Sequence, residues 1–207
     1  MALVLPVNGI APTIPASCKL LPTATVVGDV VFGEECSVWF NAVVRGDVNQ
    51  IRIGNRVNIQ DNAVIHCTYQ KFATTLGNNV SIGHNAIVHG CILQDNVLIG
   101  MGAIVMDGCT VESNSSVAAG SVVTQHTHIP AGEIWGGIPA RKIKAISPEL
   151  QKGEIERIAQ NYLMYSSWFD TPQPNTGSDT ATDTTPAPSH LVLVKKCLIS
   201  LTSMSKL

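Results

Sequence analysis

Every sixth residue between Leu93 and Val123 is aliphatic, and this period constrains the fold more than any other feature of the chain. An amphipathic helix needs apolar residues three and four apart, and a half-buried hairpin strand needs strict alternation, so neither fits. A period of six is typical of a left-handed parallel β-helix, in which each repeat forms a short strand and a corner. Three repeats then form one triangular coil. The inward-facing positions are Leu93, Ile99, Val105, Val111, Val117 and Val123.

The same repeat begins near Val26, so we expect an all-β domain over residues 1–146, with residues 1–25 as a lead-in. Two insertions interrupt the period. The first adds three residues around Asp47–Gln50, and the second adds five within Cys67–Thr75. Loops that leave a repeat scaffold in this way commonly carry function.

Beyond the repeat, the spacing of apolar residues predicts an α-helix over residues 147–170 that packs alongside the β-helix. Ser147 is a suitable N-cap, and Pro148 suits the first helical position. Residues 171–207 are rich in Thr, Pro, Ser and Asp, a composition that predicts a disordered tail.

The composition indicates which kinds of partner and which cellular compartment to expect for this protein. The net charge is −2 and no basic run occurs, which argues against nucleic acid as a partner. The apolar run Leu191–Val194 is too short to span a bilayer, and the first residues lack the pattern of a signal peptide. Six cysteines occur without a Cys-x-x-Cys spacing, so we expect reduced thiols and a cytoplasmic protein.

Counting repeats brings two histidines together. Ile65 and Val88 are three repeats apart and therefore lie on the same face of adjacent coils. His66 and His89 each follow one of them by one residue, so their side chains should stack about 4.8 Å apart. His84 falls on a different face, and it could join the other two only if copies of the chain pack around a three-fold axis.

The count also predicts two polar columns. Arg45 falls in the column of the two stacked histidines, whereas Gln60 and Asp61 share a face with His84. These columns would meet only across a subunit boundary. Three neutral imidazoles with an open fourth position are typical of catalytic zinc, which lowers the pKa of a bound water to about 7 and supplies a hydroxide nucleophile.

Several segments between Pro12 and Glu149 closely resemble the γ-class carbonic anhydrase-like family of hexapeptide-repeat proteins. The resemblance implies a homotrimer with a divalent metal, usually zinc, bound between subunits. His66 and His89 would then come from one subunit and His84 from the next. The segments are Arg45-Gly46-Asp47, Asn58-Ile59-Gln60-Asp61, His66, Ile82-Gly83-His84-Asn85-Ala86, His89-Gly90-Cys91, Ile99-Gly100-Met101-Gly102 and Gly136-Gly137-Ile138-Pro139-Ala140.

The resemblance also assigns roles beside the metal. It implies that Arg45, Asp47 and Asp61 form an ion network between subunits beside the metal. These three residues could take a direct part in catalysis or could serve only to clamp the trimer, and the two roles are compatible. The resemblance further implies that Gln60 orients the metal-bound water.

Two departures from the family pattern concern proton transfer. Val48 stands where a catalytic Glu follows the Arg-x-Asp motif, and Cys67–Thr75 contains no carboxylate. Without an acidic proton shuttle, hydration of CO₂ should be weak. The chain is more similar to the bacterial subfamily related to the carnitine-operon and phenylacetate-pathway proteins. Tyr69, Tyr162 and Tyr165 are alternative proton relays.

Three functions are therefore open. The first is a zinc lyase that hydrates CO₂ to bicarbonate in a homotrimer. The second is an acyl-CoA thioesterase or acyltransferase on the same scaffold, and the third is a non-enzymatic metal-binding trimer. The imidazole ligands would also accept Fe²⁺, Co²⁺ or Ni²⁺ in place of Zn²⁺.

Overall fold

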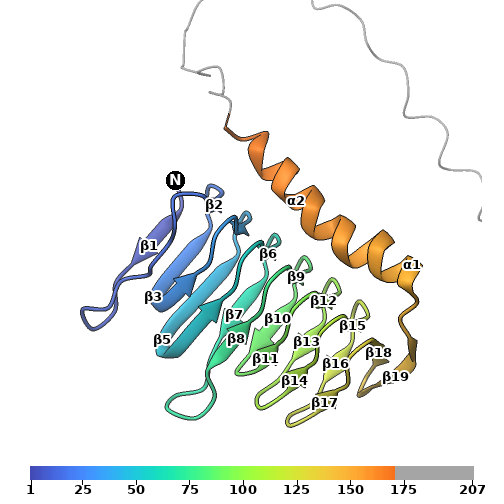
Figure 1. Cartoon of the computed structure of the whole chain (residues 1–207). Coiled ribbons are helices and arrows are strands. Elements are labelled where there is room, and N and C mark those ends of the chain that lie inside the picture. Colours follow the sequence, from blue (N-terminus) through green and yellow to red (C-terminus); the bar gives the residue numbers. More distant parts are fainter. Residues whose placement is uncertain (171–207) are drawn as a thin grey trace, which may run out of the picture. The chain divides into compact units, whose positions relative to one another are not determined.

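The aliphatic repeat winds the chain into a parallel β-helix whose interior is filled by the predicted inward-facing residues (Figure 1). The structure is a computed structural model, and it describes residues 1–170. The predicted disordered tail, residues 171–207, lies outside the described residues. The β-helix predicted from the six-residue period is confirmed.

Short parallel strands build three faces. The first face contains β1 (Leu3–Leu5), the first halves of β3 (Thr25–Phe32) and β5 (Val43–Ile53), β7 (Val64–His66), β10 (Ile87–His89), β13 (Ile104–Val105) and β16 (Val122–Val123). The second face contains the second halves of β3 and β5, β8 (Thr74–Leu76), β11 (Ile92–Leu93), β14 (Thr110–Val111) and β17 (His128–Ile129). The third face contains β2 (Lys19–Leu20), β4 (Ser37–Val38), β6 (Asn58–Ile59), β9 (Ser81–Ile82), β12 (Leu98–Ile99), β15 (Ser116–Val117), β18 (Glu133–Gly137) and the closing antiparallel strand β19 (Ala140–Ala145).

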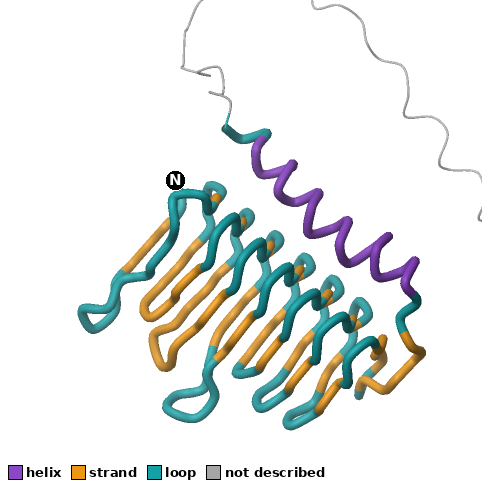
Figure 2. Tube along the Cα trace, in the orientation of Figure 1, coloured by secondary structure: helices purple, strands orange, loops and turns teal. Residues whose placement is uncertain are grey.

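Both predicted insertions leave the regular wall. Strands β3 and β5 bend from the first face to the second, and their register shifts between Gly28 and Val30, where β5 carries its extra residues. The second insertion forms the loop between β7 and β8, which extends from the wall (Figure 2). The regular coils above and below are therefore undisturbed.

The core is a stack of aliphatic side chains with small residues at the corners. Ile65, Val88 and Val105 have no exposed surface, and neither do Ala63 and Ala86 at the narrow positions. Because successive coils repeat this pattern, apolar burial favours the register in which the backbone hydrogen bonds pair the strands. Four of the predicted thiols are buried and free, at Cys36, Cys67, Cys91 and Cys109.

The chain leaves the last coil and forms a helical segment beside the third-face strands (Figure 1). The oxygen Oγ of Ser147 accepts a hydrogen bond from the backbone N–H of Leu150 at 3.3 Å, which caps α1 (Pro148–Leu150). A π-helical segment, η1 (Gln151–Glu156), which the sequence did not predict, joins α1 to α2 (Arg157–Ser167).

The helical segment packs on the β-helix through one stripe. Ile155 and Ala159 are buried, and the ring of Tyr162 meets that of Trp39 edge-on, with centroids 5.2 Å apart. The helix therefore covers the corner that follows β4 and leaves the first face open. No helix within residues 1–170 has the length and apolar character that a membrane crossing requires.

Candidate metal centre

Two imidazoles converge on the first face. His66 and His89 are register partners at the ends of β7 and β10, as the repeat count predicts. The two rings lie 5.1 Å apart between centroids, and Nδ1 of His66 is 3.0 Å from Nε2 of His89. These two ring nitrogens belong to two of the three histidines that the sequence predicts as metal ligands.

Each of these rings has a carboxylate on its far side. Nε2 of His66 lies 3.1 Å from Oδ1 of Asp47, and Nδ1 of His89 lies 2.6 Å from Oδ1 of Asp107. Arg45 pairs with the other oxygen of Asp47. Metal-binding histidines commonly hold a carboxylate in this way, since it fixes the ring orientation and the tautomer.

The local electrostatics suit neutral imidazole. Burial lowers the pKa of His66, and the charge of Arg45 lowers it further, although Asp47 opposes both effects. Burial would raise the pKa of Asp47, but hydrogen bonds from His66 and Arg45 outweigh it and lower that pKa. At neutral pH this cluster therefore contains the ionised carboxylate of Asp47 and the neutral ring of His66.

His84 lies on the corner after β9, with Asp61 at the same position one coil earlier. Nδ1 of His84 is 2.9 Å from Oδ2 of Asp61, and its Nε2 is 3.4 Å from the hydroxyl of Tyr162. The next residues, Asn62 and Asn85, have φ of 60° and 59°. This left-handed conformation, which asparagine tolerates well, turns the chain sharply.

Gln60 precedes Asp61 but is almost completely buried, with 5% of its surface exposed. Its Nε2 donates to Oδ1 of Asn58 at 3.0 Å, and Nδ2 of Asn58 donates to Oγ of Ser81 at 2.7 Å. The side chain of Gln60 is therefore held in one orientation by hydrogen bonds along the third face.

A single chain contains two separate clusters. His66, His89, Asp47 and Arg45 lie on the first face, whereas His84, Asp61 and Gln60 lie at the third-face corner. Within residues 1–170, no three histidine, cysteine or carboxylate side chains of one chain form a metal-binding group. A site with all three histidines therefore needs a second copy of the chain.

An outward-facing aliphatic column runs along the first face, directly beside the stacked histidines. Its members precede the buried core residue in each coil, and neighbours in the column are register partners. On the other faces, the corresponding columns mix polar and apolar residues. We call this set the aliphatic ladder: Val43, Val64, Ile87, Ile104 and Val122.

Sequence reasoning missed Asp107. Val88 and Val105 are register partners, so Asp107 lies at the position of Gly90 one coil further on, and its carboxylate reaches back to His89. The sequence did contain a signal for this contact. Gly90 follows the candidate ligand His89, and an aspartate at the same position of the next coil can reach His89 because a glycine leaves room for it. Burial would raise the pKa of Asp107, but hydrogen bonds from His89 and Thr68 lower it.

Comparison with known proteins identifies the class. Residues 90–125 match the family model described as "Bacterial transferase hexapeptide (six repeats)". The solved structure of a Bacillus cereus protein, assigned provisionally as an acetyltransferase, has a TM-score of 0.80 and 37% identity. The match covers 83% of this chain and 99% of the Bacillus cereus chain. The fold is therefore that of the hexapeptide-repeat proteins.

The curated relatives narrow the class to one family. Over 167 residues the chain is 37% identical to a carbonic anhydrase of Geobacillus kaustophilus, covering 81% of this chain and 91% of the relative. It is 43% identical over 162 residues to the mitochondrial gamma carbonic anhydrase 1 of Arabidopsis thaliana, covering 76% of this chain. The chain belongs to the γ carbonic anhydrase-like family. It spans only 58% of the length of that Arabidopsis protein.

Proposed function

We propose that this protein is a homotrimeric, zinc-dependent carbonic anhydrase-like enzyme that hydrates CO₂ to bicarbonate at sites shared between subunits. The observation that carries the proposal is the pair of converging ring nitrogens of His66 and His89, each backed by a carboxylate. Membership of the γ carbonic anhydrase-like family supports the same reaction.

The donor set fits zinc. His66 and His89 would supply two ligands from one subunit, and His84 would supply the third from the next, with its Nδ1 already engaged by Asp61. The 3.4 Å contact of Nε2 with the Tyr162 hydroxyl is long, so a metal could replace it at little cost. A zinc ion on three neutral imidazoles lowers the pKa of a bound water to about 7.

The remaining predicted residues have roles that follow from their positions. Arg45 and Asp47 form a chain of ion pairs beside His66, and in the proposed trimer this chain would continue to Asp61 of the next subunit. Gln60 is held rigidly by Asn58 and would orient the attacking water. These roles agree with those that the family resemblance implies, an ion network between subunits and a residue that orients the water.

The aliphatic ladder supplies a reason for assembly. Five aliphatic side chains in register face outward on the face that carries His66 and His89, and Ile87 is 37% exposed. Burying such a column against a second copy is favourable, at about 25 cal/mol for each Å² of apolar surface. We therefore place the three-fold axis beside this ladder. A cytoplasmic location remains our prediction from the free thiols.

Proton release should limit turnover. Val48 and the loop after Cys67 provide no carboxylate. Of the three candidate relay tyrosines, Tyr162 is the one beside a proposed ligand, but burial and the charge of Asp61 raise its pKa to about 12. A phenol with that pKa releases protons slowly at neutral pH, so we expect weak CO₂ hydration.

The second candidate is acyl-CoA chemistry on the same scaffold, as a thioesterase or an acyltransferase. The provisional name of the Bacillus cereus relative favours it. An imidazole that acts as general base cannot at the same time bind the metal through the same nitrogen. Thioester hydrolysis would therefore keep the metal site, whereas acyl transfer would dispense with it.

The test begins with the zinc content of the purified full-length chain and its oligomeric state. Stopped-flow CO₂ hydration and a panel of acyl-CoA thioesters then follow on the same sample. The proposal expects zinc, a trimer and zinc-dependent hydration, and His84→Ala should lose zinc while the trimer persists. Full zinc retention by His84→Ala would remove the shared site, and hydrolysis of a thioester without CO₂ hydration would favour the second candidate.

A further inference from the structure

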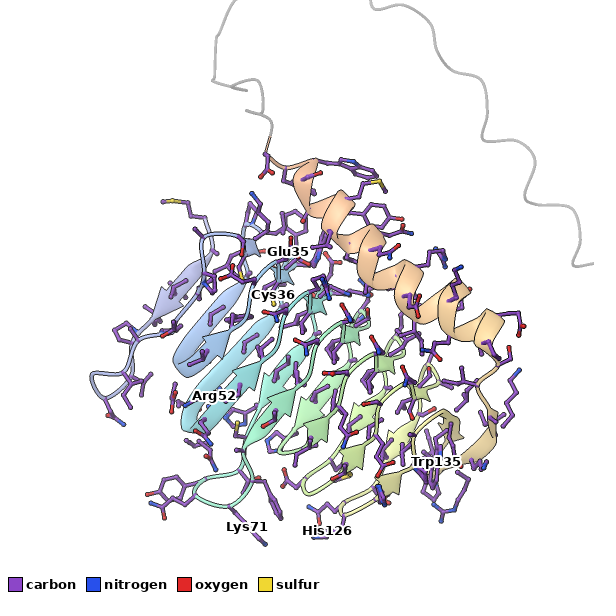
Figure 3. All side chains as sticks on the ribbon, in the orientation of Figure 1. Glu35, Cys36, Arg52, Lys71, His126 and Trp135 are labelled. Atoms are coloured by element: carbon purple, nitrogen blue, oxygen red, sulfur yellow. The ribbon has the colours of Figure 1, made fainter. Side chains whose placement is uncertain are left out.

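The inserted loop after β7 folds back onto the later coils. Thr68 and Phe72 close the loop, with the backbone N–H of Thr68 donating to the carbonyl of Phe72 at 3.0 Å. The ring of Phe72 lies edge-on to His126, with centroids 5.6 Å apart. Figure 3 labels Lys71 on this loop and His126 on the later corner, at the same edge of the β-helix. The loop is therefore docked, not free.

Through this docking, the loop holds Asp107. The hydroxyl of Thr68 donates to Oδ2 of Asp107 at 2.8 Å, while Oδ1 of Asp107 lies 2.6 Å from Nδ1 of His89. Both carboxylate oxygens are engaged, and only 15% of the Asp107 side chain is exposed. The carboxylate has one orientation because the loop fixes it from the other side.

Gly90 makes the contact possible. A Cβ at this position would lie 2.2 Å from Oδ1 of Asp107 and 2.8 Å from the Cβ of Phe72. Both neighbours would have to move to admit any side chain. The glycine thus leaves the space through which Asp107 reaches His89.

The contacts from Thr68 through Asp107 to His89 determine which nitrogen of His89 carries the proton. An ionised carboxylate has only acceptors, so Nδ1 of His89 must carry the proton and donate it to Asp107. The lone pair then lies on Nε2, the atom that faces His66 at 3.0 Å. We propose that Asp107 is a positioning residue that fixes His89 in this tautomer, and that Thr68 of the inserted loop holds Asp107 in place. The relevance to zinc rests on the proposed function.

The tautomer can be read without any metal. In the chelator-treated full-length protein with ¹⁵N-labelled histidine, we expect NMR at a pH above 8 to show His89 protonated on Nδ1. Asp107→Ala should shift His89 towards the Nε2-protonated form, whereas Asp107→Asn retains an acceptor oxygen and should preserve the wild-type form. Thr68→Val should weaken the preference, and Thr68→Ser should restore it.

The chain offers a matched control. Glu112 and His128 form a similar pair at 2.8 Å, on the second face and outside the candidate centre. We expect Asp107→Ala to weaken zinc binding by about 10- to 100-fold in competition with a chromogenic chelator. Glu112→Ala should leave zinc binding and the His89 tautomer unchanged, and thermal unfolding shows whether each variant remains folded.

The two proposals can fail separately. If His89 keeps its proton on Nδ1 in folded Asp107→Ala, the positioning role is overturned, whatever the protein binds. If the tautomer shifts as expected but the wild-type protein binds no zinc, the positioning role stands and the proposed function fails. An equal loss of zinc in Asp107→Ala and Glu112→Ala would also overturn the role, because it would report general destabilisation.

Discussion

Complementation between two defective chains tests the shared site directly. His66→Ala removes a proposed ligand from the first-face cluster but keeps His84, whereas His84→Ala removes His84 but keeps the pair of His66 and His89. Each homotrimer then lacks one ligand at all of its sites. A mixed trimer, however, has a boundary at which an intact His66 and His89 pair meets an intact His84. Co-expression of the two chains should therefore restore zinc binding that neither shows alone.

The symmetry sets the magnitude. When equal amounts of two chains assemble at random into cyclic trimers, about three quarters of the trimers are mixed. Every mixed trimer contains a single restored boundary among its three, whichever chain is in the majority. The preparation should therefore contain about one quarter of the wild-type zinc, and about one quarter of the wild-type CO₂ hydration.

The assay measures zinc by mass spectrometry in co-expressed chains that carry different affinity tags. His66→Ala with His89→Ala is the matched control pair, because both changes lie in the same half of the site. No boundary in that mixture has a complete set, so no zinc should return. Equal recovery in the test pair and the control pair, or none in either while both assemble into trimers, would refute the shared site.

Three other changes test separate parts of the argument. Ile87→Asp should raise the dissociation constant of the trimer at least about 100-fold in sedimentation analysis, because it would bury a carboxylate in the aliphatic ladder. Ile92→Asp, on the second face, should leave that dissociation constant unchanged. Gly90→Ala should lower the melting temperature more than Gly120→Ala. Both have left-handed φ, which costs about 1–3 kcal/mol, but only the first would overlap its neighbours, so equal losses would contradict that reasoning. Burial and a nearby carboxylate raise the pKa of Tyr162 to about 12 from its usual value near 10. The fold favours the neutral phenol, so the contribution of Tyr162 to the free energy of unfolding is complete below pH 10 and is lost between about pH 10 and 12. Thermal unfolding of Tyr162→Phe should lack this loss of stability at alkaline pH. The same pH profile in Tyr162→Phe and in the wild-type protein would contradict the prediction.

The fold could be predicted because a single energetic term dominates it. The inward-facing residues of the repeat, such as Ile65 and Val88, are buried, so the six-residue pattern of apolar burial indicates the coil. The same count of repeats gave the register that stacks His66 on His89 and Asp61 on His84. Backbone register is a property of the period, and the sequence displays the period directly.

The contacts that depend on side-chain conformation could not be predicted in this way. Asp107 reaches His89 across a corner, and whether it does so depends on the space above Gly90 and on a hydrogen bond from Thr68. The docking of the inserted loop depends on a ring contact with His126, which is far away in the sequence. The count also placed Gln60 beside the site but did not reveal its burial.

The proposed sharing of one metal site between two chains has a thermodynamic consequence. Each imidazole is oriented by a carboxylate of its own chain, whereas in the proposed trimer the three imidazoles would meet only across a subunit boundary. A metal that binds only the assembled form must stabilise the assembly, by about 2.7 kcal/mol for each occupied site when free zinc is 100 times its dissociation constant. Chelation should therefore raise the protein concentration at which trimers dissociate. The effect should disappear in His84→Ala, because that chain can form the boundary but offers no ligand across it.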